Sequence, residues 1–107
     1  MSTAEITVVR AHGRQDAAGA PALDQELRQH LALGRRHLVV DLSDTSYISS
    51  NGLRVLLAAL KAARQGGGTV RLCCLSARLA EIFEMAGFDQ VFDIYETRAA
   101  AERAFEE

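Results

Sequence analysis

A group of hydroxyl side chains lies between a predicted strand and a predicted helix, where a phosphate could be attached and stabilised. The five hydroxyls belong to Ser43, Thr45, Ser46, Ser49 and Ser50. The N-terminus of a helix offers unpaired backbone N–H groups and a partial positive charge, which favour an anion. A phosphate there would change the local charge by about −1.5 to −2. The pattern therefore predicts a site where phosphorylation alters a binding surface without unfolding the domain.

The elements on either side of these hydroxyls are visible in the apolar pattern. Residues 37–42 form a short, almost continuous apolar run, which is typical of a buried strand. Helical spacing begins at Leu53, and Leu56, Leu57 and Leu60 follow at i+3, i+4 and i+7, so these four leucines should face the core. The glycines at 66–68 should end this helix. The hydroxyls would then occupy a polar turn that leads into the helix.

Strands and helices alternate along the rest of the chain. We expect a strand over 5–11, a turn over 13–19, and a helix that starts near Pro21 and ends at Gly34. A strand over 69–75, a helix from Ser76 to Gly87, a short strand over 91–95 and a last helix after Thr97 should follow. This alternation indicates a sheet with parallel pairings and helices packed on it.

Length and composition exclude several classes of protein. A chain of 107 residues is one domain with a single core, and its hydrophobic fraction of 49% is ordinary for a globular protein. The net charge is −2, and no basic stripe interleaved with aromatic residues indicates nucleic-acid binding. No apolar run could span a membrane, and the first residues do not form a signal peptide. We therefore expect a cytoplasmic protein that binds neither nucleic acid nor the membrane interior.

The residues around the hydroxyls resemble the signature of the STAS domain, a family that includes the anti-sigma factor antagonists of bacteria. The resemblance rests on Asp41-Leu-Ser, followed by Tyr47-Ile-Ser-Ser-Asn-Gly-Leu-Arg-Val-Leu57, and weaker matches extend it over nearly the whole chain. It implies one STAS-like α/β domain over 1–107. The expected fold is a mixed sheet of four to five strands with about four helices packed on it.

The chain departs from the family at the residue that usually accepts phosphate. Members with the switch carry Asp-Ser-Ser-Gly, and the serine before the glycine is modified; this chain has Ser49-Ser50-Asn51-Gly52. Asn51 cannot be phosphorylated, but its side chain should be a good helix N-cap. Two outcomes stay open: Ser50 takes over as acceptor, with Ser49 as the alternate, or the protein remains permanently unmodified. Both serines could also serve only as turn and capping hydroxyls.

A strip of small apolar residues on the second predicted helix suggests a docking surface for a partner protein. Val55, Ala58, Ala59 and Ala62 form this strip beside the polar side of the helix, and it is wider than one buried face requires. We interpret Val55 as an interface residue and Ala62 and Ala63 as parts of a solvated face. A weak homodimer surface is the other interpretation of the strip. With Asp16, which matches a family position at the partner surface, the predicted partner-binding residues are Asp16, Ser49, Ser50, Asn51, Gly52, Arg54, Val55 and Ala58.

The sequence contains other candidate sites, for which the support is weaker. Asp16, Asp41 and Asp44 could together hold a divalent cation, but we interpret them as turn caps. Cys73 and Cys74 should point to opposite faces of a strand, which makes them a poor metal site, and we interpret them as core residues. The three histidines form no catalytic or ligand spacing, and no nucleophile elbow is present. We therefore predict no enzyme activity, no metal and no cofactor.

The resemblance implies binding to an anti-sigma factor of the serine-kinase type. The unmodified form would sequester that kinase and free a sigma factor, phosphorylation would end the complex, and a serine phosphatase would restore it. One alternative is a constitutive STAS subunit of a membrane lipid-transport or other transporter complex, bound to an ATPase subunit, which Asn51 favours because it removes the usual acceptor. The other alternative is a nucleotide-binding or hydrolytic protein.

Overall fold

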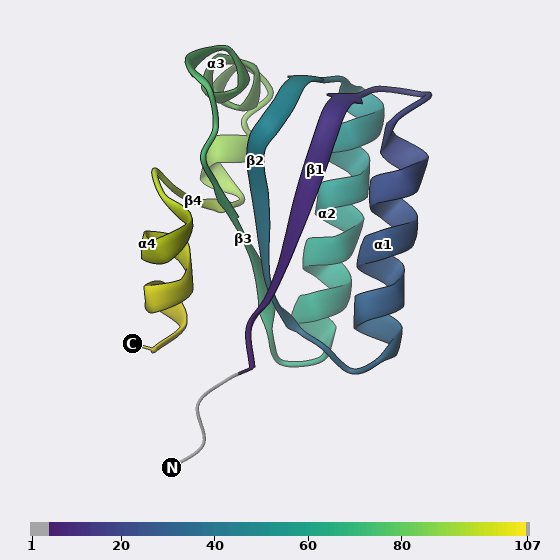
Figure 1. Cartoon of the computed structure of the whole chain (residues 1–107), viewed down its shortest axis with the longest axis vertical. Helices are drawn as coiled ribbons and strands as arrows, with labels where there is room; N and C mark the ends of the chain where they lie inside the picture. Colours follow the sequence, from purple (N-terminus) through teal and green to yellow (C-terminus); the bar gives the residue numbers. More distant parts are fainter. Residues whose placement is uncertain (1–4, 107) are drawn as a thin grey trace.

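The computed structural model describes residues 5–106, which form one four-stranded sheet with helices on both faces (Figure 1). The strands are β1 (Thr7–Gln15), β2 (His37–Ile48), β3 (Thr69–Cys73) and β4 (Asp93–Tyr95), and they lie in the order β1-β2-β3-β4. The helices are α1 (Ala20–Ala32), α2 (Ser50–Gln65), α3 (Ala77–Met85) and α4 (Arg98–Arg103). Short 3-10 turns cover Phe88–Gln90 and Ala104–Glu106.

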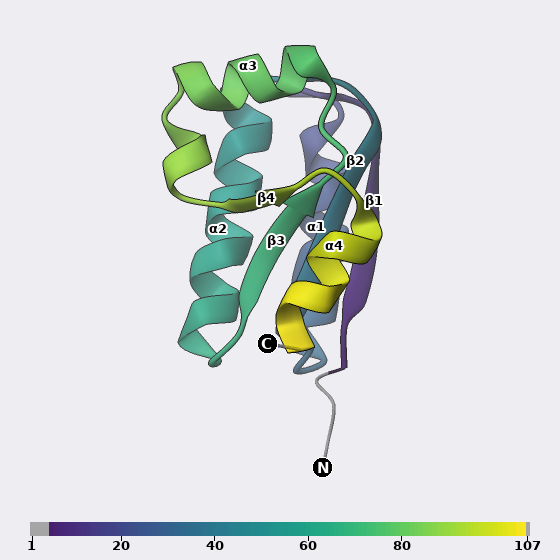
Figure 2. The ribbon, with the colours of Figure 1, turned by 90° about the vertical axis from the view of Figure 1, so that its left-hand side faces the viewer.

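The helices enclose a core on each face of the sheet. Helices α1 and α2 pack side by side on one face, α4 lies on the other, and α3 lies near the carboxyl ends of the strands (Figures 1 and 2). In β2, Leu38 and Val40 belong to the larger core under α1 and α2, whereas Val39 belongs to the smaller core under α4. Burial on both faces explains why this strand is an apolar run without alternation.

The expected α/β fold with four strands and four helices is confirmed, but two details of the sheet differ. All strand pairs in the described part of the chain are parallel, so the sheet is not mixed there. Residues 13–15 belong to β1, whereas we predicted a turn from 13 onward. Gly13 has a φ of +71°, and irregularities of register before and after it let β1 continue alongside β2 as far as Gln15.

The predicted polar turn is also largely strand. β2 runs to Ile48, so Ser43, Thr45 and Ser46 lie within it, and only Ser49 separates β2 from α2. The Thr45 hydroxyl donates a hydrogen bond of 3.0 Å to the backbone carbonyl of Ala11 and is buried between the strands. These three hydroxyls are therefore part of the sheet and not of the helix N-terminus.

Helix α2 has the predicted core face. Leu53, Leu56 and Leu60 are buried, and Leu57 is half-buried. Ala63 is fully buried, so its interpretation as a solvated residue was wrong, while Ala62 is exposed as expected. The reason is that α2 contacts both β3 and α1, which cover a wider part of its surface than the leucine stripe alone indicates. In residues 5–106, every helix is too short or too polar to cross a membrane.

The prediction that Cys73 and Cys74 point to opposite faces was also wrong. Both residues pack into the smaller core, with Val39 and Ala101. Cys74 has a φ of +66°, and this left-handed backbone conformation ends the regular alternation of side chains at the end of β3.

Candidate functional site

Ser49 connects the end of β2 to the start of α2 and holds both to the end of β1. It is the N-cap of α2, and its Oγ accepts a hydrogen bond of 3.2 Å from the backbone N–H of Asn51. The backbone N–H and the hydroxyl of Ser49 both donate to the carbonyl oxygen of Gln15, at 2.9 and 3.3 Å. Asn51, which we expected to cap the helix, is instead its second residue. Ser49 occupies the cap because α2 begins at Ser50, three residues before the leucine pattern that starts at Leu53.

Gly52 allows this close approach of β1 to the first turn of α2. A Cβ at this position would lie 2.6 Å from the carbonyl oxygen of Gln15 and 2.6 Å from Cγ1 of Ile48. Neither atom belongs to the far end of a flexible side chain, so a larger residue would displace the strand or the helix. Gly52 is buried, so it supports the packing of β1 against α2 and has no side chain that could contact a partner.

Ser50 is the first residue of α2 and is exposed to solvent. Among the described residues, its hydroxyl makes no side-chain hydrogen bond, whereas the Ser49 hydroxyl makes two contacts. The first turn of α2 contains no acidic residue that would repel an anion. Of the two candidate acceptors, Ser50 is thus the one whose hydroxyl can be modified without breaking a helix cap.

Asp16 lies next in the chain to Gln15, so the sheet brings it to the same end of the molecule as Ser49. Its Oδ1 accepts hydrogen bonds of 3.0 Å from the backbone N–H groups of Ala18 and Gly19, and its Oδ2 lies 3.2 Å from Nε of Arg14. The hydrogen bond from Gly19, then those from Arg14 and Ala18, lower the pKa of the Asp16 carboxyl. Asp16 therefore carries its charge at this end of the sheet and shapes the loop into α1.

The carboxylates Asp16, Asp41 and Asp44 do not form one site. Asp44 pairs with His12 across the sheet, and Asp16 lies four residues beyond His12, about 13 Å away along a strand at about 3.3 Å per residue. Asp41 and Asp44 instead share Arg10, at 3.6 and 3.8 Å. Burial alone would raise the pKa of the Asp41 carboxyl, but hydrogen bonds from Ser43 and the charge of Arg10 leave that pKa below its ordinary value.

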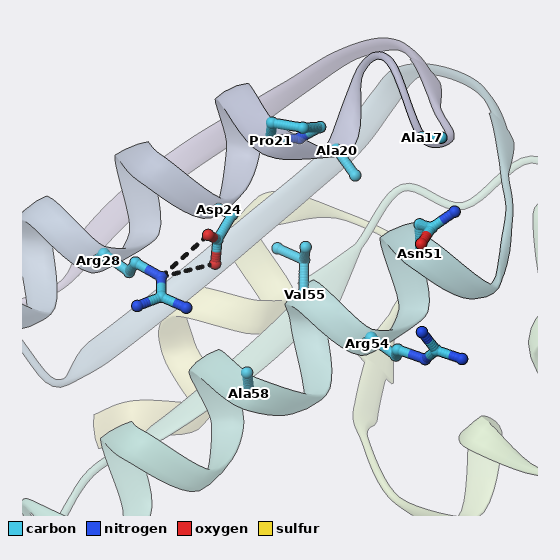
Figure 3. Close-up of a pocket in the computed structure, with 9 residues that line it drawn as sticks. All are labelled: Ala17, Ala20, Pro21, Asp24, Arg28, Asn51, Arg54, Val55 and Ala58. Atoms are coloured by element: carbon cyan, nitrogen blue, oxygen red, sulfur yellow. Dashed lines mark hydrogen bonds and ion pairs between the residues drawn. The ribbon is translucent and has the colours of Figure 1, made fainter.

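A groove runs from the helix N-terminus down between α1 and α2 (Figure 3). It has a volume of about 420 Å³ and is lined by Ala17, Ala20, Pro21, Asp24, Arg28, Asn51, Arg54, Val55 and Ala58. Val55 points from α2 toward α1, while Asp24 and Arg28 form an ion pair of 2.9 Å on the α1 side. The structure thus brings together Asn51, Arg54, Val55 and Ala58 of the predicted set, and Ser50 precedes them at the open end.

Sequence reasoning missed a cluster of arginines around an aromatic ring. The guanidinium carbon of Arg14 lies 4.6 Å from the ring centre of Tyr47, and that of Arg78 lies 5.9 Å from it. Arg14 comes from β1, Tyr47 from β2 and Arg78 from α3, so no spacing in the sequence could reveal the cluster. Tyr47 lies near the end of β2, three residues before Ser50 in the chain.

The fold defines a class of protein: a small α/β domain with a parallel four-stranded sheet and helices on both faces, whose candidate site lies at the carboxyl end of the sheet. A model of the STAS domain matches residues 2–101. The chain belongs to the STAS domain family.

Relatives in this family include named proteins of bacteria. The chain is 41% identical over 93 residues to BtrV of Bordetella bronchiseptica, whose name places it among the anti-sigma factor antagonists; the match covers 87% of this chain and 80% of BtrV. It is 35% identical over 86 residues to the anti-sigma-B factor antagonist of Bacillus subtilis, covering 80% and 78% of the two chains. An anti-sigma factor antagonist from Mycobacterium paratuberculosis has the same fold, with a TM-score of 0.86, 27% identity, and coverage of 95% and 86%.

Proposed function

We propose that this protein is an anti-sigma factor antagonist, which binds an anti-sigma factor at the carboxyl end of its sheet. Support comes from its two named relatives, which cover most of this chain at 41% and 35% identity. The binding surface would consist of Asp16, Ser49, Ser50, Asn51, Arg54, Val55 and Ala58, with Gly52 beneath it.

One observation carries the proposal that this surface is switched by phosphate: Ser50 is exposed, has an unengaged hydroxyl within the described structure, and directly precedes the α1–α2 groove. A partner that covers Arg54 and Val55 would also cover Ser50. A phosphate on Ser50 would then have to be desolvated inside the interface, and it would repel any acidic group of the partner. The same phosphate would not destabilise the free protein, because a helix N-terminus favours an anion.

The partner in this proposal is an anti-sigma factor of the serine-kinase type. This partner would phosphorylate Ser50 and thereby release itself from the complex. A serine phosphatase would reset the protein to the binding form. Phosphorylation requires a hydroxyl, and this chain has Asn51 at the family's usual acceptor position. The acceptor in this proposal is therefore Ser50, the preceding residue. The neighbouring capping serine keeps α2 folded in both states, so the switch would act on the surface and not on the fold.

A second candidate function follows from Asn51. Because the usual acceptor position carries an amide, the protein could instead bind its partner constitutively, as a STAS subunit attached to the ATPase of a lipid-transport or other transporter complex. The groove between α1 and α2 would serve either partner. The two candidates differ in one respect that can be measured, namely whether Ser50 is ever modified.

The test is intact-mass analysis with site mapping of the protein after incubation with ATP and the serine kinase encoded nearest to its gene. We expect the addition of one phosphate, which persists in Ser49→Ala and is lost in Ser50→Ala. Because Ser50→Ala removes no hydrogen bond of the described fold, its failure to react would not result from unfolding. A stable complex without any phosphate would contradict the switch and support the constitutive function.

A further inference from the structure

Cys74 has a left-handed backbone conformation, which is unusual for a residue with a Cβ. Its φ of +66° is the one positive φ of a non-glycine residue among the described residues. The left-handed region costs a residue with a Cβ roughly 1–2 kcal/mol. The conformation has one clear consequence for the side chains: the thiols of Cys73 and Cys74 lie on the same face of the sheet, toward α4.

A carboxylate from the neighbouring strand joins the two thiols. Asp41 in β2 pairs with Cys73 in β3, and partners in a parallel sheet point to the same face. One ligand atom from each of Asp41, Cys73 and Cys74 lies within 4.8 Å of the others. Asp41 is only 3% exposed, so its charge is held among these groups and away from water.

This donor set suits a cation that prefers sulfur. Zinc binds thiolates at about 2.3 Å and carboxylate oxygens at about 2.0–2.2 Å, so its ligand atoms lie roughly 3.5–4 Å apart in a tetrahedral site. The three groups are close enough to reach that spacing by small side-chain rotations. Cys73 is buried but Cys74 is only half-buried, so the cluster can be reached from solvent at Cys74. A tetrahedral ion with three protein ligands takes water as its fourth ligand.

The charges around the cluster do not forbid a cation. Arg10 lies 3.6 Å from Asp41, but it also contacts Asp44 at 3.8 Å, and its side chain is half exposed. Arg98, the other nearby cation, forms an ion pair of 3.6 Å with Glu102. Each guanidinium group therefore has a carboxylate partner outside the cluster, and Arg10 can move toward Asp44 when a metal takes its place beside Asp41.

We propose that Asp41, Cys73 and Cys74 form a binding site for a thiophilic divalent cation, with Zn²⁺ as the expected ion. The site faces α4, on the opposite side of the sheet from the α1–α2 groove (Figure 2). It does not depend on the proposed function, and it uses none of the residues assigned to partner binding. Loss of one site should leave the other intact.

The experiment is a titration of the reduced full-length protein with Cd²⁺, followed by the thiolate-to-metal charge-transfer absorption in the ultraviolet, and then competition with Zn²⁺. We expect saturation at one equivalent and displacement of Cd²⁺ by Zn²⁺.

Cys74→Gly should abolish the band, and it should fold at least as well as the original because glycine suits a positive φ. Asp41→Asn should weaken binding by about tenfold or more, as removal of an anionic group at a metal site does, while Asp44→Asn should leave it unchanged.

Two results of the titration would overturn the site. One is the absence of a charge-transfer band in the reduced protein. The other is equal Cd²⁺ affinity of the original protein and Cys74→Gly, which would place the cation elsewhere. Mass analysis distinguishes a metal site from a disulfide between the adjacent thiols. A mass two hydrogens lower in the untreated protein, together with no metal bound after reduction, would show the disulfide and contradict the proposal.

Discussion

Ser49 and Ser50 are adjacent serines with different roles at the start of α2. Ser49 caps the helix and contacts Gln15, so Ser49→Ala should lower the free energy of unfolding by about 0.5–2 kcal/mol, the usual cost of a lost N-cap. Ser50→Ala removes an exposed hydroxyl and should change stability by less than about 0.5 kcal/mol. Urea denaturation of both variants measures the difference. Equal losses would show that the two serines share the capping role.

Gly52 is needed for the close contact between β1 and α2. Gly52→Ala should destabilise the protein by about 1–3 kcal/mol, because the added methyl group would meet a backbone carbonyl and Ile48 at 2.6 Å. Gly66→Ala is the matched control, since a Cβ there would meet no neighbouring atom nearer than 3.6 Å. Thermal unfolding of the pair tests the contact, and a Gly52→Ala variant as stable as the control would disprove it.

Asp16 should make stability depend on acid pH. Hydrogen bonds from Gly19, Arg14 and Ala18 lower its pKa in the folded state below the ordinary value of 3.8. A lowered folded pKa gives stability that is present above the unfolded pKa and is lost as the pH falls through the folded pKa. Asp16→Asn should therefore flatten the fall in stability below pH 3.8, measured by denaturant titration at several pH values. An unchanged acid profile would mean that other carboxylates cause the fall.

At the scale of elements, α2 connects the core to the proposed partner surface. Leu56 is fully buried, and Leu56→Ala should cost about 2–5 kcal/mol, as for other buried leucines. Lys61→Ala, on the exposed side of the same helix, is the control and should change stability little. Denaturant titration of the two variants tests the assigned helical register. A negligible loss for Leu56→Ala would show that the leucine stripe does not face the core.

The same elements show what the sequence could predict. The i, i+3, i+4, i+7 spacing of leucines identified the core face of α2, because that face depends only on the period of a helix. The burial of Ala63 was missed because it depends on neighbouring elements, which have no local signal. The true ends of β1 and β2 were missed for a similar reason: Gly13 and the buried Thr45 extend a pairing that begins in apolar residues.

At the scale of the whole molecule, the two candidate sites lie on different parts of the sheet. The grouping of Arg54, Val55 and Ala58 in one groove was predictable, since they are close in sequence on one helix; their role in partner binding stays a prediction. The arginines around Tyr47 and the Asp41–Cys73–Cys74 cluster come from separate strands and helices. The cluster also depends on the left-handed conformation of Cys74, which contradicts the alternation that a strand pattern predicts. Only the folded chain could reveal these groups.

The central claim is that a phosphate on Ser50 controls the partner surface. Its most direct test is the dissociation constant between the anti-sigma factor kinase encoded nearest to the gene and three forms of the protein: unmodified, Ser50→Ala and Ser50→Asp. We predict equal binding of the first two forms and binding about tenfold or more weaker for Ser50→Asp, because its charge must be desolvated in the interface. Equal affinity of Ser50→Asp and the unmodified protein would contradict the account.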